Sequence, residues 1–221
     1  MSFTFFTDRL GGHSQGDFSS LNLALHVGDD PEIVLRNRDL IAKDHGPIVY
    51  MNQVHGNSIE FVSNAQNVSP TCDALVTTTP GVTLAVLTAD CIPLLLSSET
   101  VIAAVHVGRR GLVNGVAHNT VKKMRNFGAT TIAAHLGPSI CASCYEVDQV
   151  TYDEVVSDFP LAAALSSQGT LSLDLAAALV DVLKHLSITS TVDVRCTRED
   201  ETLFSYRKSH RTGRQAGLIR L

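Results

Sequence analysis

Two runs of consecutive apolar residues restrict the possible folds more than any other feature of the sequence. Residues 82–87 and 101–105 are apolar almost throughout and do not alternate with polar residues. A strand with this pattern is buried on both faces, so other layers must cover it. We therefore expect an α/β or α+β fold in which helices cover mixed β-sheets.

Turn residues and apolar periodicity place further elements around these two strands. Helical spacing predicts helices over 112–127 and 175–186, the second capped by Asp174, and Pro31 begins a helix over 31–43. Strands are predicted at 48–51, 58–62, 74–77, 82–88, 93–97 and 101–106, with shorter elements at 129–136, 148–159 and 191–196. No repeat or linker divides the chain, so we expect one domain over residues 1–221.

The composition narrows the classes of function. The chain has 221 residues, of which 44% are hydrophobic, so it can fill a sizeable core. Its charged fraction of 18% and net charge of -5 argue against nucleic acid as a partner. The N-terminus lacks the features of a secretory signal, and Asp90 interrupts the longest apolar run before it reaches membrane-helix length. We expect a cytoplasmic protein without a membrane partner; the sequence leaves the oligomeric state open.

Three residues of types that bind zinc lie where predicted strands meet turns. They are His55, Cys91 and His106, which are 36 and 15 positions apart and so form no compact finger motif. Two imidazoles and one thiolate would give a zinc site with an open fourth position, as catalysis requires. Two other interpretations remain open. The three side chains could be ordinary core residues, or Cys91 and His106 could form a metal-free thiolate and base pair as in cysteine hydrolases.

The remaining cysteines and histidines give weaker signals. Cys141 and Cys144 form a C-x-x-C pair, which could be redox-active or half of a zinc knuckle, but no second such pair exists in the sequence. We interpret both as structural thiols, and Cys72 and Cys196 as core residues. No histidines form the His-x-His pairs of multicopper sites, so copper is possible but poorly supported.

Two segments rich in arginine could bind anions. Arg109 and Arg110 open the helix that follows His106, where free backbone N–H groups favour an anion, although a solvated arginine pair is the commoner arrangement. A second polar cluster spans 205–208 and 212–217. It fits either a phosphate-contacting loop or a basic surface, and we favour an ordered surface element.

These residues lie in stretches that match a known protein family. The stretches are S-L-N-L-A-L-H-V-G-D-D-P-E (20–32), N-R (37–38), N-Q-V-H-G (52–56), D-A-L-V-T (73–77), L-A-V-L-T-A-D-C-I-P-L-L-L (84–96), A-A-V-H-V-G-R-R-G-L (103–112), G-P-S-I (137–140), Y-E-V (145–147) and T-G-R-Q-A-G-L-I (212–219). Across essentially its full length the chain resembles the laccase-domain family, also labelled polyphenol oxidase or purine nucleoside phosphorylase. The resemblance implies a layered α-β-β-α domain with mixed sheets, and a zinc ion bound by His55, Cys91 and His106.

The resemblance also implies an activity on purine nucleosides. The implied reaction is phosphate-dependent cleavage of adenosine, inosine, guanosine or methylthioadenosine to the base and the ribose 1-phosphate, with adenosine deamination as a second activity. Two alternatives from other classes stay open. One is a metal-free thiol hydrolase or amidase that uses Cys91 and His106, and the other is a non-catalytic, zinc-stabilised partner-binding protein.

We add a hypothesis for the roles of individual residues in this reaction, in which only the match of Arg110 to an arginine that the family retains comes from the resemblance. Beside the zinc ligand Cys91, we expect Arg110 to neutralise bound phosphate in catalysis and Asp90 to carry a proton in deamination. Arg38 and Asn22 are expected to contact substrate or phosphate. Arg109 stands where the family usually has Trp, so we expect it at the rim of the cleft, where it would tune substrate access.

Overall fold

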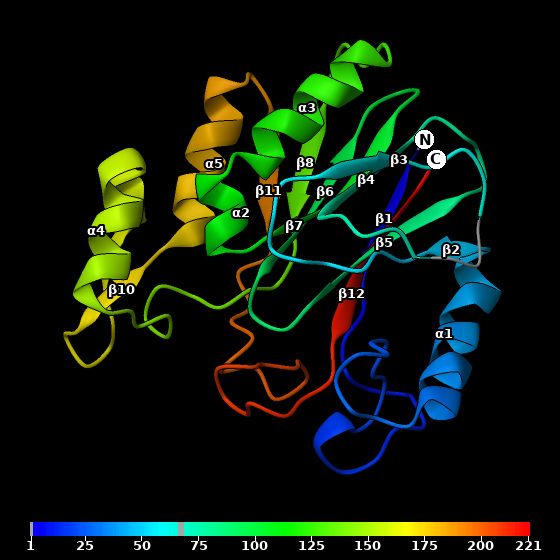
Figure 1. The fold of residues 1–221 in the computed structure, drawn as a ribbon, viewed down its shortest axis with the longest axis horizontal. Helices are drawn as coiled ribbons and strands as arrows, with labels where there is room; N and C mark the ends of the chain where they lie inside the picture. The colour runs from blue at the N-terminus through cyan, green and yellow to red at the C-terminus, as the bar shows by residue number, and fades with distance from the viewer. Residues whose placement is uncertain (1, 66–68) are drawn as a thin grey trace.

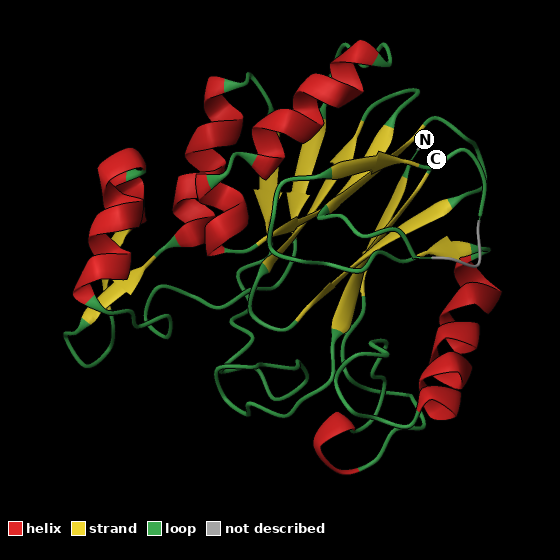
Figure 2. Ribbon diagram, in the orientation of Figure 1, coloured by secondary structure: helices red, strands yellow, loops and turns green. Residues whose placement is uncertain are grey.

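Two β-sheets packed against each other form the centre of the molecule (Figures 1 and 2). The computed structural model describes residues 2–65 and 69–221. The first sheet has the strand order β1 (Phe3–Phe6), β12 (Gln215–Arg220), β5 (Thr83–Thr88), β2 (Ile48–Val49). The second has the order β11 (Thr189–Val192), β8 (Ala133–Leu136), β6 (Ile92–Ser97), β7 (Ile102–Val107), β4 (Ala74–Thr77), β3 (Ile59–Phe61). Both contain parallel and antiparallel pairs, as expected for mixed sheets.

The two faces of each sheet explain the unbroken apolar runs. Leu84 and Val86 of β5 pack with Ile102 and Ala104 of β7 in the layer between the sheets. The alternate side chains of the same strands, such as Val105, point to the outer faces and are also buried. Each central strand is therefore covered on both sides, which is why its sequence shows no polar alternation.

Helices cover the outer faces of the two sheets. α2 (Arg109–Val113), α3 (Val116–Asn126), α4 (Gln149–Asp158) and α5 (Leu175–His185) lie on the side of the six-stranded sheet, and α1 (Pro31–His45) lies on the side of the four-stranded sheet (Figure 1). A hairpin of β9 (Ala163–Leu165) and β10 (Leu171–Leu173), with short 3-10 turns at Gly16–Phe18 and Pro160–Ala162, completes the set of elements. The expected single α+β domain with α-β-β-α layers is confirmed.

Side-chain caps fix where α1, α4 and α5 begin. Asp30 accepts a hydrogen bond from the backbone N–H of Glu32, with Pro31 in the first turn, and Asp148 caps α4 in the same way. The predicted cap at Asp174 is confirmed, because its carboxylate accepts from the N–H of Ala177 at 2.8 Å. Each cap satisfies a backbone donor that the helix itself leaves free.

Several predicted elements differ from the structure. The single helix predicted over 112–127 is two helices, because Gly115 adopts a left-handed φ of 72° between α2 and α3. The element predicted at 191–196 is the strand Thr189–Val192 followed by a loop, and β1, β9 and β10 were not predicted. The surface element expected at 212–217 is wrong for its second half, since Gln215 and Ala216 begin the buried strand β12. No helix among the described residues is both long and apolar enough to span a bilayer.

Candidate functional site

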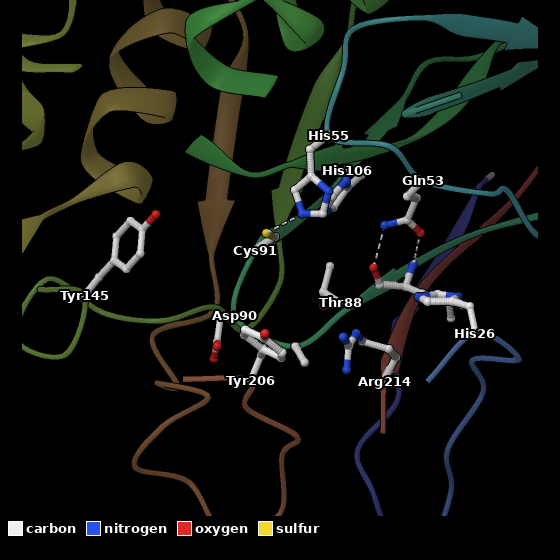
Figure 3. Close-up of a pocket in the computed structure, with 12 residues that line it drawn as sticks. His26, Gln53, His55, Thr88, Asp90, Cys91, His106, Tyr145, Tyr206 and Arg214 are labelled. Atoms are coloured by element: carbon white, nitrogen blue, oxygen red, sulfur yellow. Dashed lines mark hydrogen bonds between the residues drawn. The ribbon is translucent and has the colours of Figure 1, made fainter. Parts of the chain in front are cut away.

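Strand pairing brings three distant residues to one place. β6 and β7 pair antiparallel with Ile92 opposite Val107, so Cys91, directly before β6, lies beside His106 near the end of β7. His55 comes from the loop between β2 and β3 and completes the group (Figure 3). One ligand atom of each side chain lies within 4.8 Å of the others, and Cys91 Sγ is 3.9 Å from His55 Nε2. The predicted juxtaposition of the three residues is confirmed; their metal-binding role stays a prediction.

Asp73 organises two of these side chains from behind. It is fully buried directly before β4, and its Oδ1 lies 2.9 Å from His106 Nδ1. The same carboxylate accepts the backbone N–H of His55 at 2.9 Å and of Gly56 at 2.7 Å. A carboxylate on Nδ1 leaves Nε2 of the imidazole free to bind a metal. Asp73 was not among the residues predicted from the sequence, although an acid directly before an apolar strand was an available signal.

The charges of this group favour a thiolate. Burial opposes ionisation of Cys91, but the charge of His106 and hydrogen bonds from both histidines outweigh it and lower the pKa of the thiol to about 6. Burial likewise disfavours the imidazolium of His106, but the Cys91 thiolate and Asp73 raise its pKa to about 9. The site therefore holds a thiolate at neutral pH, which is the form that binds metals or acts as a nucleophile.

A glycine leaves the space in which the cysteine and histidine side chains approach. A Cβ on Gly108 would lie 2.9 Å from Cys91 Sγ and 3.2 Å from a ring carbon of His55. Both distances are shorter than ordinary van der Waals contacts. The glycine of the His-Val-Gly stretch is thus required by the close approach of the backbone to the site.

Asp90 is held tightly by a second segment of the chain. Its Oδ1 accepts hydrogen bonds from the hydroxyls of Thr197 and Ser205, both at 2.7 Å, and its Oδ2 accepts the N–H of Arg207 at 2.6 Å. Its φ of 105° lies in a region that non-glycine residues rarely adopt. Three donors occupy this carboxylate, so Asp90 ties the loop of residues 197–207 to the turn that carries Cys91. Its predicted role as a proton carrier stays a prediction.

The three candidate ligands open onto a cavity of about 420 Å3 (Figure 3). Its other polar and aromatic walls are His26, Gln53, Thr88, Asp90, Tyr145, Tyr206 and Arg214. The amide of Gln53 is fixed by two hydrogen bonds to the backbone of Leu87, at 2.7 and 2.9 Å. A cavity of this size with a few placed polar groups is typical of small-molecule sites.

Arg214 supplies a cationic group in this cavity. Its guanidinium donates to the carbonyls of Thr212 and Gly213, both at 2.9 Å, which orients the side chain. Burial lowers the pKa of Arg214, which still stays far above neutral pH because guanidinium does not lose its proton in proteins. Burial, followed by the charges of Arg214 and Arg38, lowers the pKa of His26. The ordered surface element expected over residues 212–217 did not indicate this position of Arg214 in the cavity wall.

The other residues predicted to bind substrate do not line this cavity. Arg110 is exposed on α2. Arg38 donates to the carbonyl of Leu23 at 2.8 Å and stacks on Tyr50. Asn22 is buried and accepts the backbone N–H of Arg214 at 3.0 Å, so it supports the cavity wall from behind. Their predicted contacts with substrate or phosphate stay predictions, and the geometry does not favour a direct contact in this cavity.

Arg109 pairs with an acid on a neighbouring helix. Its guanidinium lies 2.7 Å from the carboxylate of Glu154 of α4, and its charge partly offsets the rise that burial causes in the pKa of the cavity residue Tyr145. The predicted place of Arg109 at the rim of the cleft stays a prediction.

Comparison with known proteins identifies the family and supports the fold described above. The profile of the family described as "Multi-copper polyphenol oxidoreductase laccase" matches residues 3–221. The chain belongs to this family. A protein of Corynebacterium glutamicum named purine nucleoside phosphorylase is 44% identical, over 97% of this chain and 92% of its own. A protein of the same name from Streptomyces coelicolor is 43% identical, over 97% and 93%.

Solved structures of the family confirm the fold. The crystal structure of a Neisseria meningitidis protein is similar with a TM-score of 0.91 and 39% identity, over 100% of this chain and 94% of that one. YlmD from Geobacillus stearothermophilus is similar with a TM-score of 0.86 and 32% identity, over 99% and 91%. The resemblance stated from the sequence motifs is therefore confirmed at the level of the family.

Proposed function

We propose that the protein is a zinc-dependent purine nucleoside phosphorylase. The observation that carries the proposal is the arrangement of His55, Cys91 and His106 at one end of a cavity whose wall holds the guanidinium of Arg214. A metal and a fixed cation in one small-molecule cavity suit a reaction between a neutral nucleoside and an anion. Relatives named purine nucleoside phosphorylase, at 44% and 43% identity, support the substrate class.

The donor set fits zinc. Two imidazoles and a thiolate with Asp73 behind His106 match the ligands and the carboxylate support of catalytic zinc sites. The same three donors occur in blue-copper sites, but those sites are closed by a weak axial ligand, whereas this group faces a cavity. Zinc bound here would supply a Lewis acid to a substrate oxygen.

Side chains of the cavity would bind the phosphate and the purine. Arg214 would hold phosphate through its charge, and the rings of Tyr145 and Tyr206 offer apolar faces for the purine. In the reaction, a phosphate oxygen forms a bond to the anomeric carbon of the ribose while the bond from that carbon to the purine nitrogen breaks. The leaving purine takes up the proton that the attacking hydrogen phosphate gives up, and positioning of the two reactants supplies much of the rate. We extend the proposal to adenosine, inosine, guanosine and methylthioadenosine, with adenosine deamination as a second activity.

One experiment separates the possible reactions. The purified, zinc-loaded protein is incubated with adenosine, with and without phosphate, and the products are identified by chromatography and mass. We expect adenine and ribose 1-phosphate only when phosphate is present, and inosine from the second activity. Release of base without phosphate would indicate a hydrolase instead, and inosine alone would indicate a deaminase. No turnover of any of the four nucleosides would contradict the proposal.

A second candidate function has a specific observation in its favour. Cys91, His106 and Asp73 lie in the order of a thiolate, an imidazole and a supporting carboxylate, as in metal-free cysteine hydrolases. The imidazole of His55, whose Nε2 lies 3.9 Å from Cys91 Sγ, is an additional metal-type ligand that such a pair does not need. Activity on amides or esters that survives removal of all metal would favour this candidate.

A further inference from the structure

A second cluster of metal-binding side chains lies outside the cavity. Cys141, Cys144, Cys196 and Glu199 each offer one ligand atom, and the four atoms lie within 4.8 Å of one another. In a tetrahedral site with zinc–sulfur bonds of about 2.3 Å, ligand atoms are about 3.8 Å apart, so small side-chain rotations bring these four atoms to bonding positions. From the sequence, Cys141 and Cys144 are expected to be structural thiols, because no second C-x-x-C pair exists, and Cys196 is expected in the core, because it lies in an apolar stretch.

In the structure, a turn at residues 196–199 takes the place of the second C-x-x-C pair. Residues 141–144 form a tight turn in which the N–H of Cys144 donates to the carbonyl of Cys141 at 3.0 Å. Residues 196–199 form a matching turn in which the N–H of Glu199 donates to the carbonyl of Cys196 at 3.1 Å. Both turns present their first and fourth side chains to the same place. This is the ligand spacing of structural zinc sites, with a carboxylate in place of the fourth thiol.

Backbone contacts hold the two turns together. Ser139 and Cys196 form a β-bridge, and the N–H of Thr197 donates to the carbonyl of Ser139 at 3.1 Å. The N–H of Cys141 points to Cys196 Sγ at 3.3 Å, and Cys144 Sγ lies 3.4 Å from a carboxylate oxygen of Glu199. The group is therefore pre-arranged, and a backbone donor already faces one of the sulfur atoms.

The environment is that of a closed site rather than of a reactive thiol. Cys144 and Cys196 are buried, Cys141 is half-buried and Glu199 is exposed, so an ion can enter from one side. The thiols of Cys144 and Cys196 are thus shielded from solvent, in contrast to the partly exposed cysteines of redox-active C-x-x-C motifs. Four protein ligands complete a tetrahedral shell and leave no position for a substrate.

We propose that Cys141, Cys144, Cys196 and Glu199 bind a structural Zn²⁺ ion. The ion would join the segment that carries Tyr145 to the segment that holds Asp90 in place. Tyr145, which lines the cavity, follows Cys144 directly, and Thr197, whose hydroxyl holds Asp90, follows Cys196 directly. This site is independent of the proposed nucleoside chemistry, because none of its ligands lines the cavity.

Metal content tests the proposal without any activity assay. The metal-stripped protein is titrated with Co²⁺ alone and then with Zn²⁺ alone, followed by absorption spectroscopy and elemental analysis. We expect two ions per chain and strong sulfur-to-cobalt absorption from a site with three thiolates. The variant Cys144→Ser/Cys196→Ser should bind one ion and lose most of that absorption. Cys91→Ser should keep this ion, and Cys72→Ala, which removes a buried thiol outside both clusters, should keep two.

A surface variant keeps the test valid if the double cysteine variant does not fold. Glu199→Ala removes an exposed ligand, so it should fold and should bind the second Zn²⁺ at least tenfold more weakly in competition with a chromogenic chelator. The proposal is overturned if the wild-type protein binds one ion that Cys91→Ser abolishes, or if Glu199→Ala keeps wild-type affinity. An intact mass showing a disulfide among Cys141, Cys144 and Cys196 in anaerobically purified protein would also overturn it.

Discussion

Asp73 shows how one buried residue can set the geometry of a site to which it contributes no ligand. Its carboxylate is bonded to the ring of His106 and to the backbone beside His55. Burial alone would raise the pKa of Asp73, but the hydrogen bond from His106 and that from the N–H of Gly56 keep it below the ordinary value. The acid therefore stays ionised and fixes the imidazole of His106 and the backbone of His55.

Replacing Asp73 with Asn should weaken zinc binding at this site by about 10- to 100-fold. The amide retains the shape but loses the charge that supports the imidazole. Competition with a chromogenic chelator measures the affinity. Asp193→Asn, which removes an acid paired with Arg195 away from the site, serves as the control and should leave it unchanged. Equal affinities in the two variants would show that Asp73 only supports folding.

Gly108→Ala should remove or severely weaken metal binding, because its Cβ would lie 2.9 Å from Cys91 Sγ. The matched control is Gly169→Ala. Gly169 has a φ of 76°, which is unfavourable for alanine, but no atom lies within 4 Å of the new Cβ. The control should cost about 1 kcal/mol of stability and keep its metal. Elemental analysis measures the metal content of both folded variants. A Gly108→Ala variant with the wild-type metal content would refute the claim that a Cβ at this position disturbs the site.

The positions of Arg214 and Arg110 lead to different expectations for the effect of each arginine on phosphorolysis. Arg214 lines the cavity, whereas Arg110 is exposed on α2. We expect Arg214→Gln to reduce phosphorolysis by about 100- to 1000-fold, the loss typical of one charge-stabilising donor, and Arg110→Ala to change it by less than about threefold. Steady-state kinetics over a phosphate series measures both. A steep loss in Arg110→Ala would restore the role that the family resemblance implied for it.

At the scale of elements, the central strands were predicted most accurately from the sequence. A strand buried on both faces gives an apolar run that can be recognised without knowing which strands pair with it. The run 74–77 is a strand with those bounds. The predicted strand 82–88 differs from β5 by one residue at its start, and 101–106 differs from β7 by one residue at each end. β12 was missed because Gln215 and Gly217 interrupt its apolar pattern. The structure explains both residues: Gln215 bonds the backbone of Phe204, and a Cβ on Gly217 would press on Phe6 and Pro93 at 3.1 Å.

The amide of Gln215 fastens the loop that carries Tyr206 to β12. Its Oε1 accepts the N–H of Phe204 at 2.7 Å, and its Nε2 donates to the carbonyl of Phe204 at 3.1 Å. Gln215→Leu leaves both buried groups without a partner and should lower the free energy of unfolding by about 2–4 kcal/mol. Urea denaturation measures the change, with the exposed Gln168→Leu as control. A cost below about 0.5 kcal/mol would mean that the loop is held by other contacts.

At the scale of the molecule, the site could be predicted only in part. Residue types and the family resemblance indicated His55, Cys91 and His106, but their spacing in the chain says nothing about distance. Their proximity depends on the register of β6 on β7 and on the loop held by Asp73. Arg214 could not be placed, because its position follows from β12 lying between β1 and β5 in the sheet. Long-range pairing of this kind leaves no local pattern in the sequence.

The central claim is that a metal held by these three residues is needed for phosphate-dependent cleavage of purine nucleosides. The most direct measurement is the rate of ribose 1-phosphate formation from inosine and phosphate as Zn²⁺ is returned to metal-stripped protein, in parallel for wild type and Cys91→Ser. We expect no activity without metal, a rise that saturates with zinc in the wild type, and none in Cys91→Ser. Full turnover in the stripped protein, or wild-type activity in Cys91→Ser, would contradict the account.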